Sequence, residues 1–349
     1  MTASRPVPAA LGSRDDPHAQ ARAARTGPLL LHSLTFFRDV FVTLFAARRI
    51  TTVVEVGVES GAVTAMYADL GATDVFAVDP SPTVDLQERY EGDERLHLVS
   101  RHSPAALDDL PVADLYVIDG DHNYAVVRRE VDWVLRHAPD ALIVLHDVLW
   151  PCGRRDQYYA PSTVPEGERH PSSEEGATVW HDDLTPAGFV GLGAFTAALT
   201  AGGERNGVLT AVEDALEDAA GTWTLRIVPA VFGLGVVVRE GAPGAQEILR
   251  GVEPFASSTM LATLENNRLA LYTRVLEMQY EAGRHADDAD AMAEALVERT
   301  RRIEDLDREL ARTRRELDEA RAPRPEPEPR PPKELARAAV RRLRRAVSR

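Results

Sequence analysis

The sequence predicts an α/β fold in which a doubly wound, mostly parallel sheet of seven strands is covered by helices. Short runs rich in Val, Ile and Leu alternate with helical segments between residues 52 and 146. This is the pattern of strands buried on both faces and joined by right-handed crossovers. Two further strand-like runs are separated only by the residues AVFG, a link too short for a parallel crossover, so they predict an antiparallel hairpin.

The expected elements follow in chain order. The parallel strands are Thr52–Gly57, Asp74–Asp79, Leu96–Ser100, Asp114–Asp119 and Ala141–His146, and the hairpin strands are Trp223–Pro229 and Leu234–Arg239. Apolar residues at helical spacing predict an amphipathic helix over Leu29–Arg49 and further helices at Pro186–Ala201 and Val208–Ala220. The segment Val148–Leu184 is too rich in Pro, Gly and charge for regular structure, so we expect a functional loop or disorder there.

This alternation defines a domain at residues 29–255, preceded by a segment, 1–28, whose composition predicts disorder. Residues 256–321 are expected to be helical, residues 322–332 to form a stiff proline-rich linker, and residues 333–349 to form a basic amphipathic tail. Such a tail fits an anionic membrane surface, and a solvated charged tail is the alternative.

A heptad pattern lies within the helical extension. Apolar residues recur every seven positions at Ala289, Leu296, Ile303, Leu310 and Leu317, with Met292, Leu306 and Ala320 at the companion positions. This predicts a coiled coil through which the protein self-associates, weakened by Arg299 and Thr313 at core positions. A single helix or a disordered segment is the alternative.

Composition excludes several classes of protein. A net charge of -15 argues against nucleic-acid binding, which needs clustered Lys and Arg, so we expect a small-molecule substrate. The single cysteine, Cys152, excludes a disulfide framework and multi-cysteine metal sites, and we interpret it as structural. The sequence shows neither a transmembrane run nor a secretory signal, which predicts a cytoplasmic protein, with the tail allowing a peripheral membrane location.

A cofactor site is predicted at the ends of the first two strands. The first strand leads into a turn with the pattern E-x-G-x-x-x-G, formed by Glu55, Gly57 and Gly61. Glycine allows a tight turn and close approach of the backbone to a ligand. Asp79 ends the second strand, where a carboxylate can hold ribose hydroxyls. NAD fits this spacing too, although the third glycine of its G-x-G-x-x-G pattern is missing.

A second group of candidate residues follows the fourth and fifth strands. Asp119, His146 and Asp147 offer two carboxylates and an imidazole for a divalent ion. Between them in sequence, His122 can accept a proton near neutral pH. The alternative is that these residues cap helices and pair with Arg128 and Arg129.

Three stretches carry a resemblance to a known family: VVEVGVESGAVTAMYADLGATDVFAVDP, YVIDGDHNYAVVRREVD and ALIVLHDV. They resemble the Rossmann-like class I S-adenosylmethionine-dependent methyltransferases, among them bacterial sugar and antibiotic O-methyltransferases and proteins named after cephalosporin hydroxylase. The similarity covers about residues 30–239. It implies S-adenosylmethionine as cofactor, bound by Glu55, Gly57, Gly61, Asp79 (ribose), Ser103 (adenine) and Asp119.

The resemblance also implies catalytic roles. Metal-dependent relatives hold magnesium at positions matching Asp119, His146 and Asp147, and their base matches either His122 or Asp121. The chain departs from them at His146, where those relatives carry a carboxylate. Imidazole is a poorer magnesium ligand, so the metal could be manganese or iron, or the site could be metal-independent.

The resulting functional hypothesis is O-methylation of a small-molecule or sugar hydroxyl. An NAD-linked oxidoreductase and a non-catalytic scaffold that presents the coiled coil and the tail remain alternatives. We also expect the segment Trp150–Tyr159 to form a lid in which Arg154, Arg155, Tyr158 and Tyr159 contact a polar acceptor, an ordinary surface loop being the alternative.

Overall fold

The computed structural model describes residues 15–27, 33–58, 61, 63–82, 86–322 and 332–346. It divides into two units, residues 1–282 and residues 283–349. Most of the segment predicted to be disordered, and most of the proline-rich linker, lie outside the described residues. Within the former, Ala19–Thr26 forms helix α1, which the sequence analysis did not predict.

The first unit is built on a seven-stranded sheet in the order β3-β2-β1-β4-β5-β10-β9. Its parallel strands are β1 (Thr52–Val56), β2 (Asp74–Val78), β3 (Leu96–Val99), β4 (Leu115–Ile118) and β5 (Leu142–Leu145). The strands β9 (Trp223–Val228) and β10 (Leu234–Arg239) form a hairpin in which β10 runs antiparallel to both β5 and β9. This confirms the predicted mostly parallel sheet with a terminal antiparallel hairpin.

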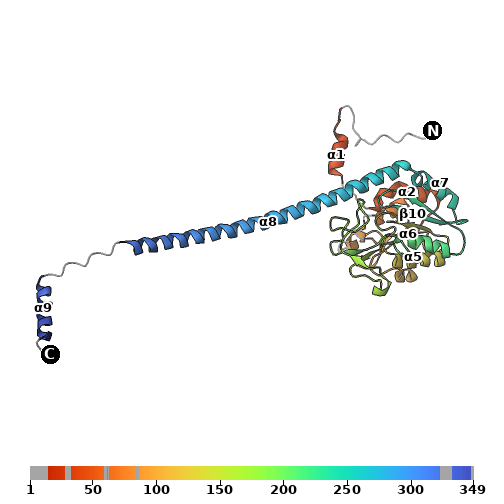
Figure 1. The fold of residues 1–349 in the computed structure, drawn as a ribbon. Helices are drawn as coiled ribbons and strands as arrows, with labels where there is room; N and C mark the ends of the chain where they lie inside the picture. Colours follow the sequence, from red (N-terminus) through yellow and green to blue (C-terminus); the bar gives the residue numbers. More distant parts are fainter. Residues whose placement is uncertain are drawn as a thin grey trace. The chain divides into compact units, whose positions relative to one another are not determined.

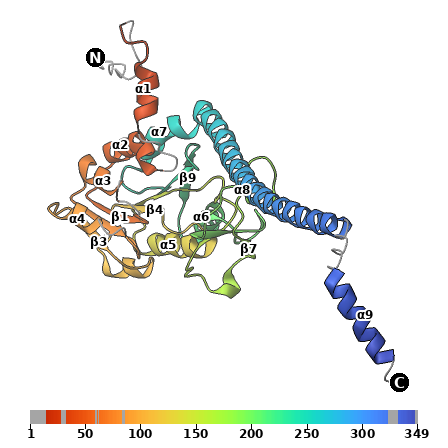
Figure 2. The same ribbon diagram turned by 90° about the vertical axis from the view of Figure 1, so that its left-hand side faces the viewer.

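Helices cover both faces of this sheet (Figure 2). Two of them, α2 (Arg38–Ala47) and α7 (Ala245–Ala256), contact each other, as do α5 (Tyr124–His137) and α6 (Val208–Asp218). Short helices α3 (Thr64–Leu70) and α4 (Leu86–Tyr90) follow β1 and β2. Because side chains alternate along a strand, Val53 of β1 packs in the core beneath α2 and Val54 in the core beneath α5. Burial of both strand faces explains the nearly continuous apolar runs.

One predicted helix, Pro186–Ala201, is wrong. Its end forms β8 (Phe195–Ala198), the middle strand of a small antiparallel sheet with β6 (Gln157–Tyr159) and β7 (Ser172–Ser173). The apolar spacing suggested a helix, but glycines break it: a Cβ on Gly191 would lie 2.3 Å from the carbonyl oxygen of Phe195. The long segment between β5 and α6, residues 148–207, is therefore ordered, and we call it the excursion after β5.

The helix α8 (Thr259–Arg321) runs through both units (Figure 1). Its first part belongs to the first unit and buries Glu265, Leu269 and Thr273, so that unit extends past the predicted boundary at residue 255. From residue 283 onward its side chains are exposed. The second unit also contains α9 (Pro332–Ala346). No helix among the described residues is long and apolar enough to span a membrane.

Candidate active site

The glycine turn after β1 lies against the end of β4. Gly57 has φ +84°, and a Cβ on it would lie 2.3 Å from the carbonyl oxygen of Asp119. Its own amide donates to the carbonyl of Val78, at 2.9 Å. Glycine is required here because the turn combines a left-handed conformation with backbone-to-backbone contact. The second glycine, Gly61, has φ +67° and leaves no room for a Cβ beside Leu86; positions 59, 60 and 62 lie outside the described residues.

Glu55 is buried and turned toward α3. Its carboxyl accepts hydrogen bonds from the hydroxyls of Thr64, at 2.5 Å, and Tyr67, at 3.5 Å. Burial raises the pKa of Glu55 to about 8. These contacts give the carboxyl a role in holding α3 against β1, and its predicted part in cofactor binding stays a prediction.

Asp79 follows β2 and joins two turns at the same edge of the sheet. One carboxylate oxygen accepts from the amide of Val58 at 3.0 Å, and the other accepts from the amide of Ser81 at 2.8 Å. The carboxylate thus lies next to the glycine turn, where a ribose-binding acid is expected in this fold.

Ser103, the predicted adenine contact, is tied to α5. Its hydroxyl donates to the carboxyl of Glu130, which is 1% exposed. The second oxygen of Glu130 has no hydrogen-bond partner among the described residues. Burial raises the pKa of Glu130 to about 8. Glu130 could not be recognised from the sequence, because a glutamate inside a helix carries no local signal of burial.

We expect Glu130→Gln to become more stable, relative to the wild type, as pH rises. The folded-state pKa is above the ordinary 4.5, so this carboxyl stabilises the fold below the unfolded-state pKa and loses that contribution as pH rises toward about 8. The gain between pH 5 and pH 8 should be roughly 2–4 kcal/mol, measured by urea unfolding. The exposed Glu247→Gln serves as control, and parallel pH profiles for Glu130→Gln and the wild type would contradict the expectation.

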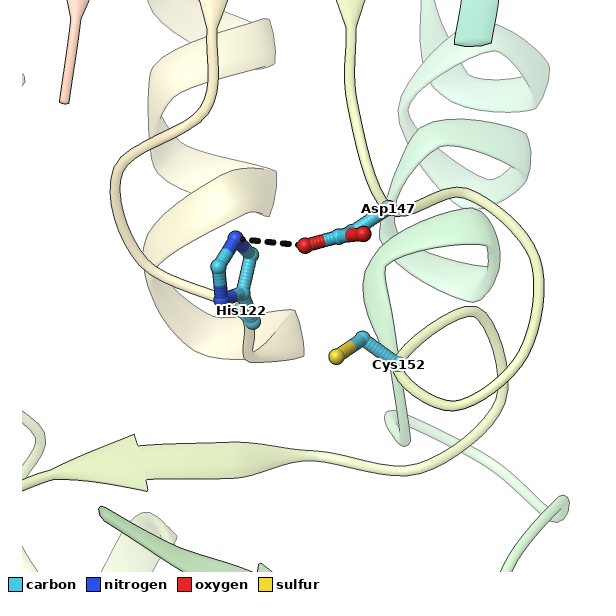
Figure 3. A group of neighbouring side chains, drawn as sticks. All are labelled: His122, Asp147 and Cys152. Carbon is cyan, nitrogen blue, oxygen red and sulfur yellow. Dashed lines mark ion pairs between the residues drawn. The ribbon is translucent and has the colours of Figure 1, made fainter. Parts of the chain in front are cut away.

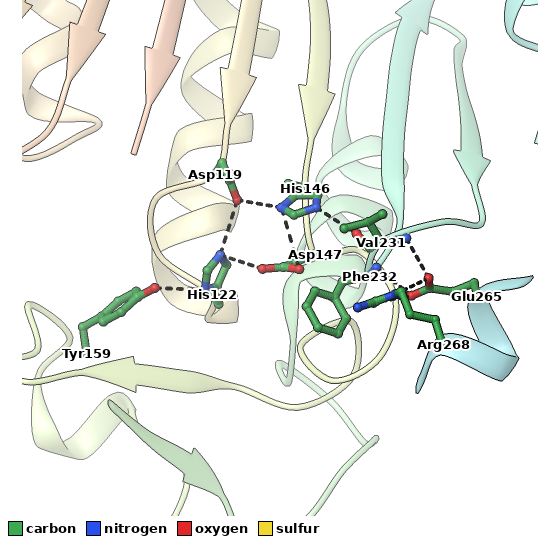
Figure 4. A network of polar contacts seen from close by, with 9 residues as sticks. All are labelled: Asp119, His122, His146, Asp147, Tyr159, Val231, Phe232, Glu265 and Arg268. Atoms are coloured by element: carbon green, nitrogen blue, oxygen red, sulfur yellow. Dashed lines mark hydrogen bonds and ion pairs between the residues drawn. The ribbon is translucent and has the colours of Figure 1, made fainter. Parts of the chain in front are cut away.

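Four ionisable side chains form a closed group at the ends of β4 and β5, which we call the Asp–His ring: Asp119, His122, His146 and Asp147 (Figure 4). Nδ1 of His146 lies 3.0 Å from Oδ1 of Asp119 and 3.8 Å from Oδ1 of Asp147. Nε2 of His122 lies 3.0 Å from Oδ2 of Asp147 and 3.6 Å from Oδ1 of Asp119. Register explains the grouping, since Ile118 and Leu145 are paired neighbours and their successors leave the same edge.

His146 is the most deeply held member of the ring, with a 2% exposed side chain. Its Nε2 donates to the carbonyl oxygen of Val231, at 2.9 Å, and its ring packs edge-on against Phe37. Burial favours the neutral imidazole, but the carboxylates of Asp119 and Asp147 outweigh it and raise the pKa of His146 to about 9. The same contacts hold the pKa of Asp119 well below its usual range despite burial.

His122 faces the ring with Nε2 and the long excursion with Nδ1. The hydroxyl of Tyr159 lies 3.4 Å from Nδ1. Burial favours the neutral imidazole, but Tyr159 and the carboxylates of Asp147 and Asp119 outweigh it. The pKa of His122 therefore lies well above its ordinary value. Both imidazoles of the Asp–His ring therefore have a pKa above the ordinary histidine value, because both face the carboxylates of Asp119 and Asp147.

Asp121, the alternative base, lies outside the ring. It accepts a hydrogen bond from the side chain of Asn123 at 2.9 Å, and burial raises its pKa. The alternative role predicted for these candidates is helix capping. It is Asn123 that caps α5, because its side chain accepts a hydrogen bond from the amide of Val126.

The same alternative expects the candidate residues to pair with Arg128 and Arg129, but these arginines pair with other acidic residues. Arg128 pairs with Asp132 and Asp218. Arg129 lies 3.9 Å from Glu168. Among the described ion pairs, neither arginine engages a member of the Asp–His ring.

Cys152 lies closer to the ring than the sequence suggested. Its Sγ, one nitrogen of His122 and one oxygen of Asp147 all lie within 4.8 Å of one another (Figure 3). The thiol is buried, and burial raises its pKa, which disfavours the thiolate that a nucleophile requires. This agrees with a structural role, although sequence distance concealed the proximity to His122.

The donor atoms of Asp119, His146 and Asp147 fit a divalent ion. They lie within 4.8 Å of one another, and Oδ1 of Asp147 is buried without a hydrogen-bond partner among the described residues. The bond from Nε2 of His146 to Val231 directs Nδ1 toward the carboxylates, an arrangement common behind metal-binding imidazoles. A bound ion would take the place of the proton on Nδ1.

The excursion after β5 is anchored to the start of α5. The buried Asp156 accepts hydrogen bonds from the amides of Tyr124 and Gly207, both at 2.7 Å, and from the hydroxyl of Tyr158. The amide of Gln157 donates to the carbonyl of His122, at 2.9 Å. The role of Asp156 could not be recognised from the sequence, because the amides that it binds, those of Tyr124 and Gly207, are distant in the chain.

Only one of the four predicted acceptor contacts in this excursion reaches the ring. Tyr159 lies beside His122, whereas Tyr158 is buried and bonded to Asp156. Arg155 is also buried and donates to backbone carbonyls, and Arg154 pairs with Glu213 in the middle of α6. Three of these side chains therefore stabilise the excursion itself.

Comparison with known proteins identifies the domain. Residues 54–148 match the family described as a methyltransferase domain. This range includes every predicted cofactor, base and metal residue, from Glu55 to Asp147. No curated protein matches the chain. The match and the sheet order show a methyltransferase domain with the class I fold.

Several solved structures are similar in part. The C-terminal domain of precorrin-6Y C5,15-methyltransferase from Rhodobacter capsulatus is 24% identical, over 33% of this chain and 65% of that one, with a TM-score of 0.27. An amino pentose methyltransferase from Micromonospora echinaspora is 16% identical, over 63% and 96%, with a TM-score of 0.37. An O-methyltransferase from Bacillus cereus is 14% identical, over 63% and 88%, also with a TM-score of 0.37.

Proposed function

We propose that this chain, an S-adenosylmethionine-dependent methyltransferase by its domain and fold, methylates a hydroxyl group of a small molecule with His122 as the general base. The observation that carries the proposal is the Asp–His ring, which lies at the same sheet edge as the glycine turn and Asp79. The cofactor supplies an electrophilic methyl group, and the residues of this edge align the acceptor and remove its proton.

The geometry favours Nδ1 of His122 as the atom that accepts the proton. Asp147 lies 3.0 Å from Nε2, so it can hold the proton on that nitrogen and leave Nδ1 free of one in the neutral ring. The Tyr159 hydroxyl, 3.4 Å from Nδ1, marks a position that an acceptor hydroxyl can take. Asp121 is the weaker candidate because its carboxylate is bonded to Asn123.

Asp119, His146 and Asp147 would hold the divalent ion, and the mixed nitrogen and oxygen ligands favour manganese or iron over magnesium. Such an ion would lower the pKa of an acceptor hydroxyl. The positive charge on His146 also offsets the carboxylates when the ion is absent.

A row of aromatic side chains near the ring supports an acceptor with an apolar or sugar face. Neighbouring rings in the row have centroids between 5.8 and 6.2 Å apart, and its members are Trp150, Phe232, Phe189, Phe195 and Tyr159. Aromatic faces pack well against sugar rings and planar groups. We therefore include a sugar-containing acceptor in the proposal.

Calorimetric titration with S-adenosylmethionine and with NAD tests the cofactor. We expect binding of the first only; binding of NAD alone would favour the oxidoreductase alternative. Incubating cell extracts with labelled cofactor, followed by mass spectrometry, then identifies the acceptor. No transfer to any component, despite cofactor binding, would support the scaffold alternative.

We also propose that residues 289–321 of α8 pair with a second copy as a parallel, in-register coiled coil. The core-position side chains are exposed in the single chain, for example Leu296 at 66% and Ile303 at 60%. In a parallel pair, Glu309 faces Arg314 of the second copy, and Arg302 and Glu316 face Asp307 and Arg321, so the flanking charges attract. This arrangement also brings the two basic tails to the same end, where their predicted membrane binding would add.

We expect Glu309→Arg to raise the dimer dissociation constant about 10-fold, because it places like charges opposite each other at two symmetric positions. Adding Arg314→Glu should restore dimerisation, because Arg at position 309 then faces Glu at position 314 of the second copy. The restoration must come from this contact between helices, since residues five apart in one helix do not contact each other. Sedimentation equilibrium of the full chain measures both effects. A monomeric wild type, or a double variant no better than Glu309→Arg, would contradict the parallel pairing.

A further inference from the structure

The turn between β9 and β10 has an unusual backbone conformation. Val231, Phe232 and Gly233 have φ values of 44°, 63° and 89°, so three successive residues are left-handed. A β-branched residue such as valine strongly disfavours this region. The turn therefore needs an external contact that stabilises it.

Glu265 of α8 supplies that contact. Its two carboxylate oxygens accept hydrogen bonds from the amides of Val231 and Phe232, both at 2.9 Å. Successive amides in such a turn form a concave anion-binding site, which the carboxylate fills. Arg268 donates to both oxygens at 2.7 Å and lies over the ring of Phe232. Despite burial, these contacts lower the pKa of Glu265, so the carboxylate stays ionised.

The opposite side of the same turn faces the Asp–His ring. The carbonyl of Val231 accepts from Nε2 of His146 at 2.9 Å. The carbonyls of Phe232 and Gly233 accept from the amides of Leu149 and Val148, at 2.7 and 3.4 Å. The Glu265 carboxylate therefore fixes the turn whose carbonyl groups bind His146 and Val148, the residues on either side of Asp147.

From this continuous chain of contacts, drawn in Figure 4, we propose that Glu265 is a positioning residue for the reaction: through the Val231–Gly233 turn it sets the orientation of His146 and of the strand end that carries Asp147. The proposal rests on the methyl transfer proposed above. It makes the first turns of the long C-terminal helix part of the active site, although Glu265 touches neither substrate nor the ring itself.

The test compares Glu265→Gln with Glu277→Gln, which alters an exposed ion pair on the same helix. Proton–nitrogen NMR of histidine-labelled protein reports the hydrogen-bonded Nε2 proton of His146 independently of activity. In Glu265→Gln we expect this resonance to shift or broaden through exchange, and turnover to fall about 10-fold or more, with the dissociation constant for S-adenosylmethionine within about 2-fold. Glu277→Gln should match the wild type in all three.

An unchanged His146 resonance in a folded Glu265→Gln protein would overturn the proposal. A shifted resonance with unchanged turnover would preserve the structural coupling and count against the proposed role of the ring in methyl transfer. Should Glu265→Gln fail to fold, Glu265→Asp keeps the charge beside Arg268 and withdraws it by one methylene. It is expected to show the same changes to a smaller degree, and its matching the wild type would also overturn the proposal.

Discussion

Replacing His122 by glutamine is expected to lower the turnover number for methyl transfer by about 10²–10⁴-fold, the usual contribution of a general base. Glutamine keeps the approximate size of the side chain and can donate to Asp147 and Asp119, but it cannot accept a proton from the acceptor. Affinity for S-adenosylmethionine should change little, because the glycine turn and Asp79 lie on the neighbouring strands. Single-turnover assays with the acceptor found by labelling measure the effect.

The pH dependence provides an independent check on this base. Only the neutral imidazole can accept a proton, and the pKa of His122 lies above its ordinary value of 6.5. The wild-type rate should therefore increase with pH through a pKa above 6.5, and this limb should be missing in the glutamine variant. His137→Gln, an exposed position at the end of α5, is the matched control. Near-normal turnover of His122→Gln would transfer the role of base to Asp121.

The sheet could be predicted from the sequence because its signals are local. Each strand is a short apolar run, and the five-residue link between Trp223–Val228 and Leu234–Arg239 forces an antiparallel hairpin. The convergence of Asp119 and Asp147 follows from the rule that parallel strands end at one edge. For this reason all four members of the Asp–His ring could be recognised as candidates from the sequence.

The supporting residues could not be predicted, because their partners lie far away in the chain. Glu265 acts on a turn 33 and 34 residues before it, and Asp156 joins the starts of two helices that lie on either side of it in sequence. The wrong helix at 186–201 has a similar cause, since the contact of Gly191 with Phe195 outweighs the local apolar spacing. The candidate site side chains could be recognised in the sequence, and the side chains that hold them in place could not.

Gly57→Ala is expected to abolish cofactor binding and to destabilise the domain by roughly 3 kcal/mol or more. The added methyl group would meet the carbonyl of Asp119 at 2.3 Å and Cα of Gly120 at 2.5 Å. Both are backbone atoms, so the clash can be relieved only by moving the glycine turn or the end of β4. Either movement separates the glycine turn, where we expect the cofactor to bind, from the Asp–His ring.

Gly71→Ala isolates the conformational part of this effect. Gly71 ends α3 with φ +119°, yet no described atom lies within 4 Å of the position that an added methyl group would take. This variant should lose only about 1–2 kcal/mol and keep its affinity for S-adenosylmethionine. Thermal unfolding and calorimetric titration of the two variants separate strain from contact. Equal losses in both would show that backbone conformation alone, and not the packing of the turn on β4, makes glycine necessary at position 57.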